Sequence, residues 1–425
     1  MTDAARSVQR TYLLLILLTT LAASFIWGIN TLFLLDAGLT NTEAFAANAF
    51  FAAGQLVFEV PTGVVADTRG RRFSFLLGAG TLLVSTLLYL AMWNIEAPFW
   101  GWALASALLG LGFTFFSGAT EAWLVDALKA SSFTGNLESV FGRAQVVSGG
   151  AMLAGSVGGG IIAQATNLGV PYIVRAAMLG LTLVVAWWLM RDLGFTPDRS
   201  ASPVKAVRTV IDGAVDGGLK NPPVRWLMLA APFTTGIGFY AFYAAQPYLL
   251  ELYGDPNAYS VAGLAAAIVA ASQIAGGLMV PYVRRLFTRR THAIILATIV
   301  SVGLLAAIGI TTSFLVAIVL LSSWCMLLAI EAPMRQSFIN GVIPSEQRAT
   351  VLSFDSLMGS AGGVVAQPVL GRVADVSGYA ASYLVAAGIQ AFAIPFTLLA
   401  RRENAASDPI TSRPEPVPQA ATIPD

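Results

Sequence analysis

Apolar runs of about 20 residues recur along almost the whole chain, and this feature restricts the possible fold more than any other. At about 1.5 Å per residue, a helix of that length crosses the hydrocarbon layer of a bilayer, which is about 30 Å thick. Only 11% of the residues are charged and 56% are hydrophobic. Soluble domains have roughly 25% and 45–50%, respectively. The sequence therefore predicts an all-α membrane protein that crosses the bilayer many times.

Counting the apolar runs predicts twelve transmembrane helices. The first run, from Tyr12 to Leu35, is too long for the hydrophobic part of a secretory signal, so we expect it to remain as the first span. The predicted spans begin near Tyr12, Glu43, Phe73, Pro98, Ser139, Pro171, Val224, Ala258, Thr291, Ser313, Thr350 and Tyr379.

The twelve spans are expected to form two pseudo-symmetric six-helix bundles. We assign residues 1–193 to the N-terminal half, 194–223 to a cytoplasmic linker, 224–401 to the C-terminal half and 402–425 to a disordered cytoplasmic tail. The linker is polar and interrupted by proline, and the tail has the composition of a disordered segment. The halves resemble copies, because TRGRR matches FTRR (pairing Arg71 with Arg289) and TEAWL matches IEAPM. Parallel repeats of this kind build midplane sites in transporters.

The basic residues predict the orientation, because Lys and Arg near span ends are retained in the cytoplasm. If both termini are cytoplasmic, only Arg175 and Arg372 of the 24 Lys and Arg residues fall near the outer face. We therefore expect a multi-pass protein of the cell (cytoplasmic) membrane with both termini inside.

The charged stretch GVVADTRGRR, which separates the second and third spans, resembles the signature loop of the major facilitator superfamily. Gly63, Asp67, Gly70, Arg71 and Arg72 occupy the motif positions, whereas Thr68 replaces the usual arginine. The resemblance implies two six-helix halves that alternate access to a central site. It also implies a gate in which Asp67 and Arg71 pair with an acid at the inner end of span four, the place of Asp126.

Ionisable residues at membrane depth are costly and are therefore functional candidates. The deepest are Glu59, Glu121, Glu331 and Arg335. A carboxyl group in a partly dry cavity can bind and release a proton near neutral pH. Glu121 is the first candidate for proton coupling and Glu331 the second, while Glu59 is expected to support the gate. Glu331 and Arg335 are four residues apart, so they could instead simply neutralise each other.

Polar and aromatic residues at helical spacing predict the lining of a substrate cavity. Aromatic faces beside a carboxylate would suit a lipophilic cation, although these aromatics could equally pack between helices. The candidates are Trp27, Asn30, Arg143, Tyr240, Tyr243, Gln246 and Arg335.

The prediction of the transport direction is based on a weaker motif. GSVGGG in span five, with Gly155, Gly159 and Gly160, resembles the glycine and proline motif of drug/proton antiporters, and Pro368 supplies the proline in the second half. The resemblance favours proton-coupled efflux of an amphipathic or drug-like compound. The alternative is a proton-coupled symporter for a sugar or other polar solute, in which a span-four acid and Arg143 bind the solute.

Other classes of protein are disfavoured by missing residues. One histidine cannot form a two-histidine zinc site, no Gly-x-Ser-x-Gly elbow occurs, and none of the three lysines follows glycine as in a phosphate-binding loop. A membrane-embedded carboxylate hydrolase remains a remote alternative. The net charge of +1 gives no indication of nucleic acid. We expect no enzyme activity and no cofactor or metal. The expected partners are the lipid bilayer, a small-molecule substrate and protons, and the protein is expected to be a monomer.

Overall fold

A computed structural model describes residues 2–197, 203–343 and 348–410 of the chain. The regular secondary structure of these residues is helical, apart from one isolated bridge between Arg289 and Pro409. Eleven helical segments in the described part are long and apolar enough to cross a membrane. The predicted all-α membrane protein is therefore confirmed.

The last of these segments explains why eleven segments are found where the sequence predicts twelve spans. It runs over Thr350–Arg402, and its 53 residues are far more than one crossing requires. Gly378 interrupts it with a φ of 82°, a backbone conformation that glycine adopts without a steric penalty. The segment therefore supplies two crossings, as the sequence predicts.

The N-terminal half contains eight helices, because two of its six spans are broken. Gly28 and Ile29 separate the first span into two helices, so that its main helix covers Asp3–Trp27 rather than Tyr12–Leu35. Phe115 to Gly118 interrupt the fourth span. The helices are α1 (Asp3–Trp27), α2 (Asn30–Asp36), α3 (Asn41–Arg69), α4 (Arg71–Asn94), α5 (Phe99–Thr114), α6 (Ala119–Ala130), α7 (Leu137–Ala165) and α8 (Gly169–Leu189).

The linker is more ordered than its polar composition indicates. It contains α9 (Pro203–Ala214) and a π-helix, η1 (Val215–Leu219), so only part of it is a loop. The C-terminal half contains α10 (Pro222–Tyr253), α11 (Tyr259–Val283), the 3₁₀ turn η2 (Arg284–Leu286), α12 (Arg290–Ile310), α13 (Phe314–Asn340), α14 (Arg348–Ala391) and α15 (Ala393–Arg402).

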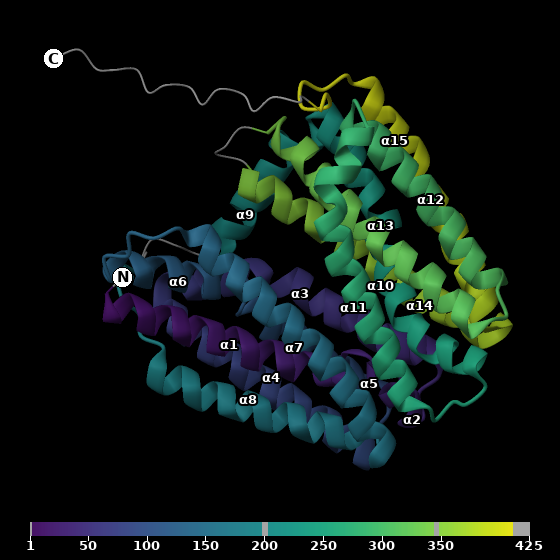
Figure 1. The fold of residues 1–425 in the computed structure, drawn as a ribbon, viewed down its shortest axis with the longest axis horizontal. Helices are drawn as coiled ribbons and strands as arrows, with labels where there is room; N and C mark the ends of the chain where they lie inside the picture. Colours follow the sequence, from purple (N-terminus) through teal and green to yellow (C-terminus); the bar gives the residue numbers. More distant parts are fainter. Residues whose placement is uncertain (1, 198–202, 344–347, 411–425) are drawn as a thin grey trace.

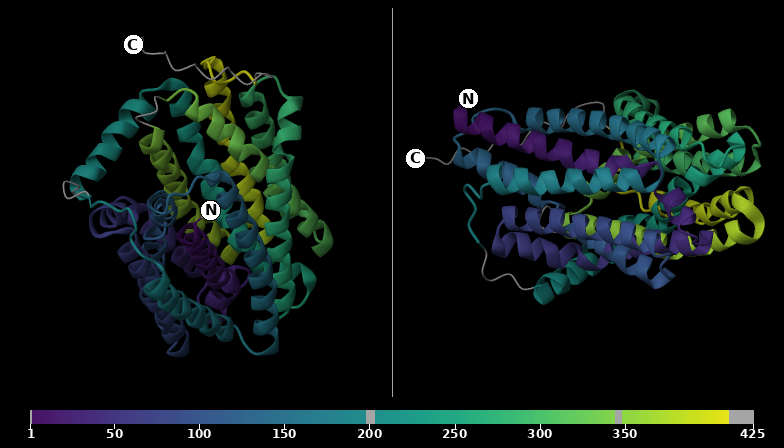
Figure 2. Two further views of the ribbon diagram at one scale, coloured as in Figure 1. Left: turned by 60° about the vertical axis from the view of Figure 1, so that its left-hand side comes forward. Right: turned by 90° about the horizontal axis from the view of Figure 1, so that it is seen from below.

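The two halves meet at one end of the molecule and diverge toward the other (Figure 1). The start of α1 and the end of α15 lie at the diverging end, which we call the termini end. The opposite end, which carries α2, is called the far end. A second orientation shows the spans running side by side along the long axis (Figure 2).

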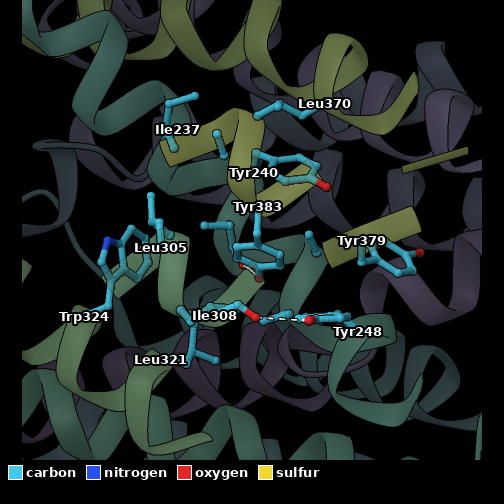
Figure 3. Close-up of a cluster of buried hydrophobic side chains, with 14 of the residues drawn as sticks. Ile237, Tyr240, Tyr248, Leu305, Ile308, Leu321, Trp324, Leu370, Tyr379 and Tyr383 are labelled. Carbon is cyan, nitrogen blue, oxygen red and sulfur yellow. Dashed lines mark hydrogen bonds between the residues drawn. The ribbon is translucent and has the colours of Figure 1, made fainter. Parts of the chain in front are cut away.

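A buried aromatic cluster holds the C-terminal half together (Figure 3). Tyr240, Tyr248 and Tyr383 are all less than 3% exposed. Buried tyrosine hydroxyls need hydrogen-bond partners, and here Tyr248 donates to the carbonyl of Ile308 at 3.0 Å and Tyr383 to that of Ala241 at 2.7 Å. These bonds connect α10, α12 and α14 within a single half.

Glycines of the GSVGGG segment in α7 allow close contacts between helices. A Cβ atom on Gly155 would lie 2.5 Å from Ser24, and one on Gly159 would lie 2.0 Å from the carbonyl oxygen of Phe25 on α1. Gly160 lies against Gly263 of α11, in the other half. The segment therefore packs α1 and also forms part of the contact between the halves. Pro368 lies inside α14.

Candidate functional site

A cavity of about 1010 Å³ lies between the two halves. It matches the upper end of the range for small-molecule sites, about 300–1,000 Å³. Eleven helices supply its wall, namely α1, α2, α3, α4, α5, α7, α8, α10, α11, α13 and α14. The cavity thus occupies the position at which pseudo-symmetric transporter halves form a central site.

The wall combines aromatic rings with uncharged polar groups. Four predicted cavity residues lie in it: Trp27, Asn30, Tyr243 and Arg335. The side chain of Asn30 is held in place, because it donates to Asn48 at 2.9 Å and accepts from the Tyr172 hydroxyl at 3.0 Å. Further polar residues of the wall are Thr19, Thr20, Ser24, Asn48, Gln55, Ser148, Thr234, Thr235, Gln273, Gln336 and Ser356.

Three predicted cavity residues lie elsewhere. Tyr240 is in the aromatic cluster described above and donates to Ser382 at 2.5 Å. Gln246 is buried in the contact between the halves, and Arg143 is exposed outside the cavity wall. A spacing of three residues turns a helix by about 300°, so Tyr240 and Gln246 point about 60° to either side of Tyr243.

The charges in the cavity are paired differently from the sequence prediction. Glu331 and Arg335 both line the cavity, but Arg335 forms its ion pair with Asp355 of α14. The two nitrogen–oxygen distances are 2.5 and 2.6 Å, and Arg335 also donates to the carbonyl of Leu227 at 3.0 Å. Among the described residues no ion pair within 4 Å includes Glu331. Glu331 therefore retains a free carboxyl group at the cavity wall.

Arg175, which the sequence analysis placed near the outer face, lies in the cavity wall. Its side chain is buried, with the residue only 2% exposed. Nε donates to the Thr86 hydroxyl at 3.0 Å and one terminal nitrogen donates to the carbonyl of Ala22 at 3.2 Å. The sequence analysis counted this arginine only as an orientation signal and therefore missed it.

The remaining predicted carboxylates lie outside the cavity wall. Glu121, the first candidate for proton coupling, is exposed in the first turn of α6. Glu59 accepts a hydrogen bond of 2.6 Å from Ser117, at the break between α5 and α6. Of Glu59, Glu121 and Glu331, only Glu331 lines the cavity.

Hydrogen bonds between the halves close the cavity at the far end. Gln246 accepts from the backbone N–H of Thr31 at 2.8 Å and donates to the carbonyl of Trp27 at 2.9 Å. Trp27 also stacks on Phe242, with ring centroids 4.7 Å apart. The region around Gln246 is therefore a barrier between the cavity and the far end.

Asp375 adds a second set of bonds across the far end. Its carboxylate accepts from the backbone N–H groups of Asn41 and Thr42, each at 2.9 Å, and from the Thr42 hydroxyl at 2.5 Å. Tyr379 also donates to the side chain of Asn41. A carboxylate of α14 thus caps the first turn of α3, where the helix dipole favours negative charge.

Replacing Asp375 with alanine is expected to favour opening of the far end. The loss of these charge-assisted bonds should cost the closed state about 1.5 kcal/mol, or roughly tenfold in population. Spin labels on Thr166→Cys and Ser377→Cys, with Cys325 replaced by alanine, would report the separation of the halves. We expect a larger population at long distances in the Asp375 variant and no change in Glu251→Gln, an exposed acid at the same end. An unchanged distance distribution would contradict a latch at Asp375.

The signature loop lies at the termini end and is bonded within its own half. Arg71 pairs with Asp67 at 2.5 Å, and the backbone N–H of Arg72 donates to Asp192 at 2.8 Å. Arg72 also donates to the carbonyl of Trp187 at 2.7 Å. Burial raises the pKa of Asp192 above its ordinary value, although the Arg72 N–H opposes this shift. In the described part of the chain no ion pair within 4 Å joins Asp126 to this loop.

The C-terminal half repeats this arrangement with the first residues of the tail. The backbone N–H of Thr291 donates to Asp408 at 2.8 Å and its hydroxyl donates at 2.9 Å. Thr291 is the second residue of α12, just as Arg72 is the second residue of α4. Arg72 therefore corresponds to Thr291, one position away from the alignment predicted from the sequence. The tail is docked as far as residue 410 rather than disordered from 402, and residues 411–425 lie outside the described part.

A helical membrane protein with paired halves around a cavity closed at one end has the construction of a transporter. Residues 12–366 match the family model of the Major Facilitator Superfamily. Because this match covers most of the chain, the protein belongs to that superfamily. It is a secondary transporter rather than an enzyme.

Comparisons with individual proteins agree on the fold. An uncharacterized MFS-type transporter of Methanocaldococcus jannaschii is 23% identical over 192 residues, which cover 45% of this chain and 48% of the relative. The chain thus spans about half the length of this curated relative. A crystal structure of the nucleoside transporter NupG has a TM-score of 0.74 at 10% identity and covers 94% of this chain and 99% of the other. The D-xylose–proton symporter has a TM-score of 0.64 at 14% identity and covers 92% and 96%.

Proposed function

We propose that this protein exports a small amphipathic molecule from the cell by alternating access, in exchange for protons. The observation that carries the proposal is the central cavity, which is closed at the far end by bonds between the halves and has the free carboxyl group of Glu331 in its wall. Opening the far end and closing the termini end would expose the same cavity to the opposite face of the membrane.

The orientation follows from the basic residues at the termini end. Arg69, Arg71 and Arg72 lie at one loop there, and Arg289 and Arg290 lie at its counterpart in the other half. Such clusters favour the cytoplasmic face of the cell membrane. The structure would then represent the state in which the cavity is open to the cytoplasm.

The signature loop is the proposed gate of the cytoplasmic face. The Asp67–Arg71 ion pair bridges the end of α3 and the start of α4, and the side chain of Asp67 is 48% exposed. Closure would bring the C-terminal half against this loop and Asp126 on the neighbouring α6. When the termini end is open, the C-terminal half must lie away from this loop and from Asp126.

Glu331 is the proposed proton carrier. A carboxyl group inside the membrane is costly when charged unless it is paired or hydrated. Arg335 is occupied by Asp355, so the protonation of Glu331 can change with access to water on either face. Its place in the wall favours Glu331 over Glu121, which is exposed outside the cavity.

Proton-coupled uptake of a polar solute is a second candidate, because side-chain amides line the cavity. Asn30, Asn48, Gln55, Gln273 and Gln336 offer donors and acceptors to a hydroxylated molecule. The large aromatic share of the same wall favours an amphipathic substrate over a sugar.

The two candidates predict different proton movements. Inside-out membrane vesicles with an acidic interior should lose their pH gradient when an amphipathic substrate enters in exchange for protons. Phenylbutanesulfonate and phenylbutyltrimethylammonium are suitable probes, because their permanent charges prevent them from crossing as neutral forms. We expect at least one probe to dissipate the gradient in vesicles containing the protein, and neither to do so in vesicles without it. Alkalinisation of the medium when a sugar is added to intact cells would instead favour uptake.

A further inference from the structure

Arg175 is a buried cation without a countercharge. It lies seven residues into α8, and the residue is 2% exposed. Its hydrogen-bond acceptors are the Thr86 hydroxyl and the Ala22 carbonyl, both of which are neutral. Among the described residues no carboxylate lies within 4 Å of its guanidinium group. A membrane protein that keeps such a residue bears a substantial desolvation cost.

The other charges of the cavity cannot compensate for Arg175. Arg335 and Asp355 neutralise each other through two short bonds. Glu331 is the remaining acid of the wall, and it belongs to the opposite half of the protein. When Glu331 is protonated, the described cavity therefore carries one net positive charge, which is supplied by the N-terminal half.

Aromatic side chains from both halves line the same cavity as this charge. Trp27, Phe51 and Phe113 come from the N-terminal half. Phe239, Phe242 and Trp324 come from the C-terminal half. An apolar or aromatic body can pack against these rings, while a cationic group would be repelled by Arg175. The guanidinium group is well suited to oxyanions, because its donors match the geometry of carboxylate and sulfonate groups.

We propose that the substrate is an amphipathic oxyanion whose charged group pairs with Arg175 and whose apolar body packs against the aromatic wall. This inference rests on the proposed export of an amphipathic compound and reverses the lipophilic cation expected from the sequence. A bound monoanion supplies the countercharge that the protein lacks. The preference for an anionic substrate thus depends on Arg175, which is not part of the proposed gate.

Binding of the two permanently charged probes to purified full-length protein tests this assignment. Phenylbutanesulfonate and phenylbutyltrimethylammonium share an apolar body and differ in the sign of their charge. Titration calorimetry should give a Kd for the sulfonate that is at least about tenfold lower than for the cation, the difference expected of one charge-assisted pair. Arg175→Gln should lose this preference, Arg175→Lys should keep part of it, and Arg372→Gln, an exposed arginine outside the wall, should match the wild type.

Each alternative outcome rejects a distinct statement. If the cation binds the wild type as tightly as the sulfonate or more tightly, the anion assignment is wrong, while export of an amphipathic compound still stands. If neither probe binds, both the assignment and the amphipathic substrate of the proposed function are wrong. Should Arg175→Gln fail to fold, the wild-type preference still decides the sign of the charge. Thr86→Val removes one hydrogen-bond acceptor of Arg175. This variant then tests whether Arg175 causes the preference for the sulfonate.

Discussion

Glu331→Gln is expected to abolish proton-driven transport while leaving substrate exchange intact. Glutamine has nearly the same shape as glutamate and can form hydrogen bonds, but it cannot release a proton. Glu331 lies in the cavity wall with Arg175, Arg335 and Asp355 as the other charged groups. Because Arg335 and Asp355 pair with each other, Glu331 is the group whose charge can change without breaking an existing ion pair.

Reconstituted liposomes separate the two activities. A pH gradient should drive accumulation of a probe that the wild type transports, whereas the Gln variant should show only exchange between labelled and unlabelled probe at equal pH. Glu121→Gln is the matched control, because it makes the same chemical change at an exposed position outside the cavity. Gradient-driven accumulation by Glu331→Gln at the wild-type level would exclude Glu331 as the proton carrier. Loss of coupling in the Glu121 variant alone would restore the first choice made from the sequence.

The general fold was predictable because the thickness of the hydrocarbon layer sets the length of each apolar span. Apolar runs indicate the crossings directly, and the loop at Gly63–Arg72 indicates the superfamily by its motif. The breaks at Gly28 and Gly118 were missed, because an interrupted span has the same overall hydropathy as a continuous one. The docked start of the tail was missed because composition does not show that Asp408 caps a distant helix.

The charged site was harder to predict, because pairing across helices leaves no mark in local spacing. Glu331 and Arg335 are four residues apart, a spacing that suggests an ion pair. Asp355 on the next helix is better placed, because it accepts from both terminal nitrogens of the Arg335 guanidinium group. The role of Arg175 in the cavity was missed for a related reason. The sequence analysis used this arginine only to predict the orientation, whereas here α8 directs it to Thr86 and Ala22.

Asp355→Asn is expected to destabilise the protein strongly, because it removes the countercharge of Arg335. The Asp355 side chain is 10% exposed and that of Arg335 is 20% exposed. Breaking a buried ion pair by removing one partner costs about 3–5 kcal/mol, and we expect about 3 kcal/mol here because some water still reaches the guanidinium group. Arg335 also bonds to Leu227, so the loss should loosen the contact of α10, α13 and α14 beside the cavity.

Thermal unfolding in detergent measures this loss against a surface ion pair of the same chain. Lys220 and Asp216 are 2.7 Å apart, but their side chains are 69% and 58% exposed. Asp216→Asn should therefore change the stability far less than Asp355→Asn does. Equal stability of the Asp355 and Asp216 variants would show that the buried pair contributes little.

The double variant Arg335→Met with Asp355→Leu separates stability from function. Apolar residues of similar volume often replace a buried pair without loss of stability, so the double variant should recover most of what Asp355→Asn loses. Transport should not recover with it, because two apolar side chains would change the polarity of the wall next to Glu331 and leave no ionised group to orient water there. Recovery of both properties would mean that the pair only fills space. Recovery of stability alone would show that these charges serve transport, at a site where a simpler apolar packing would hold the helices equally well.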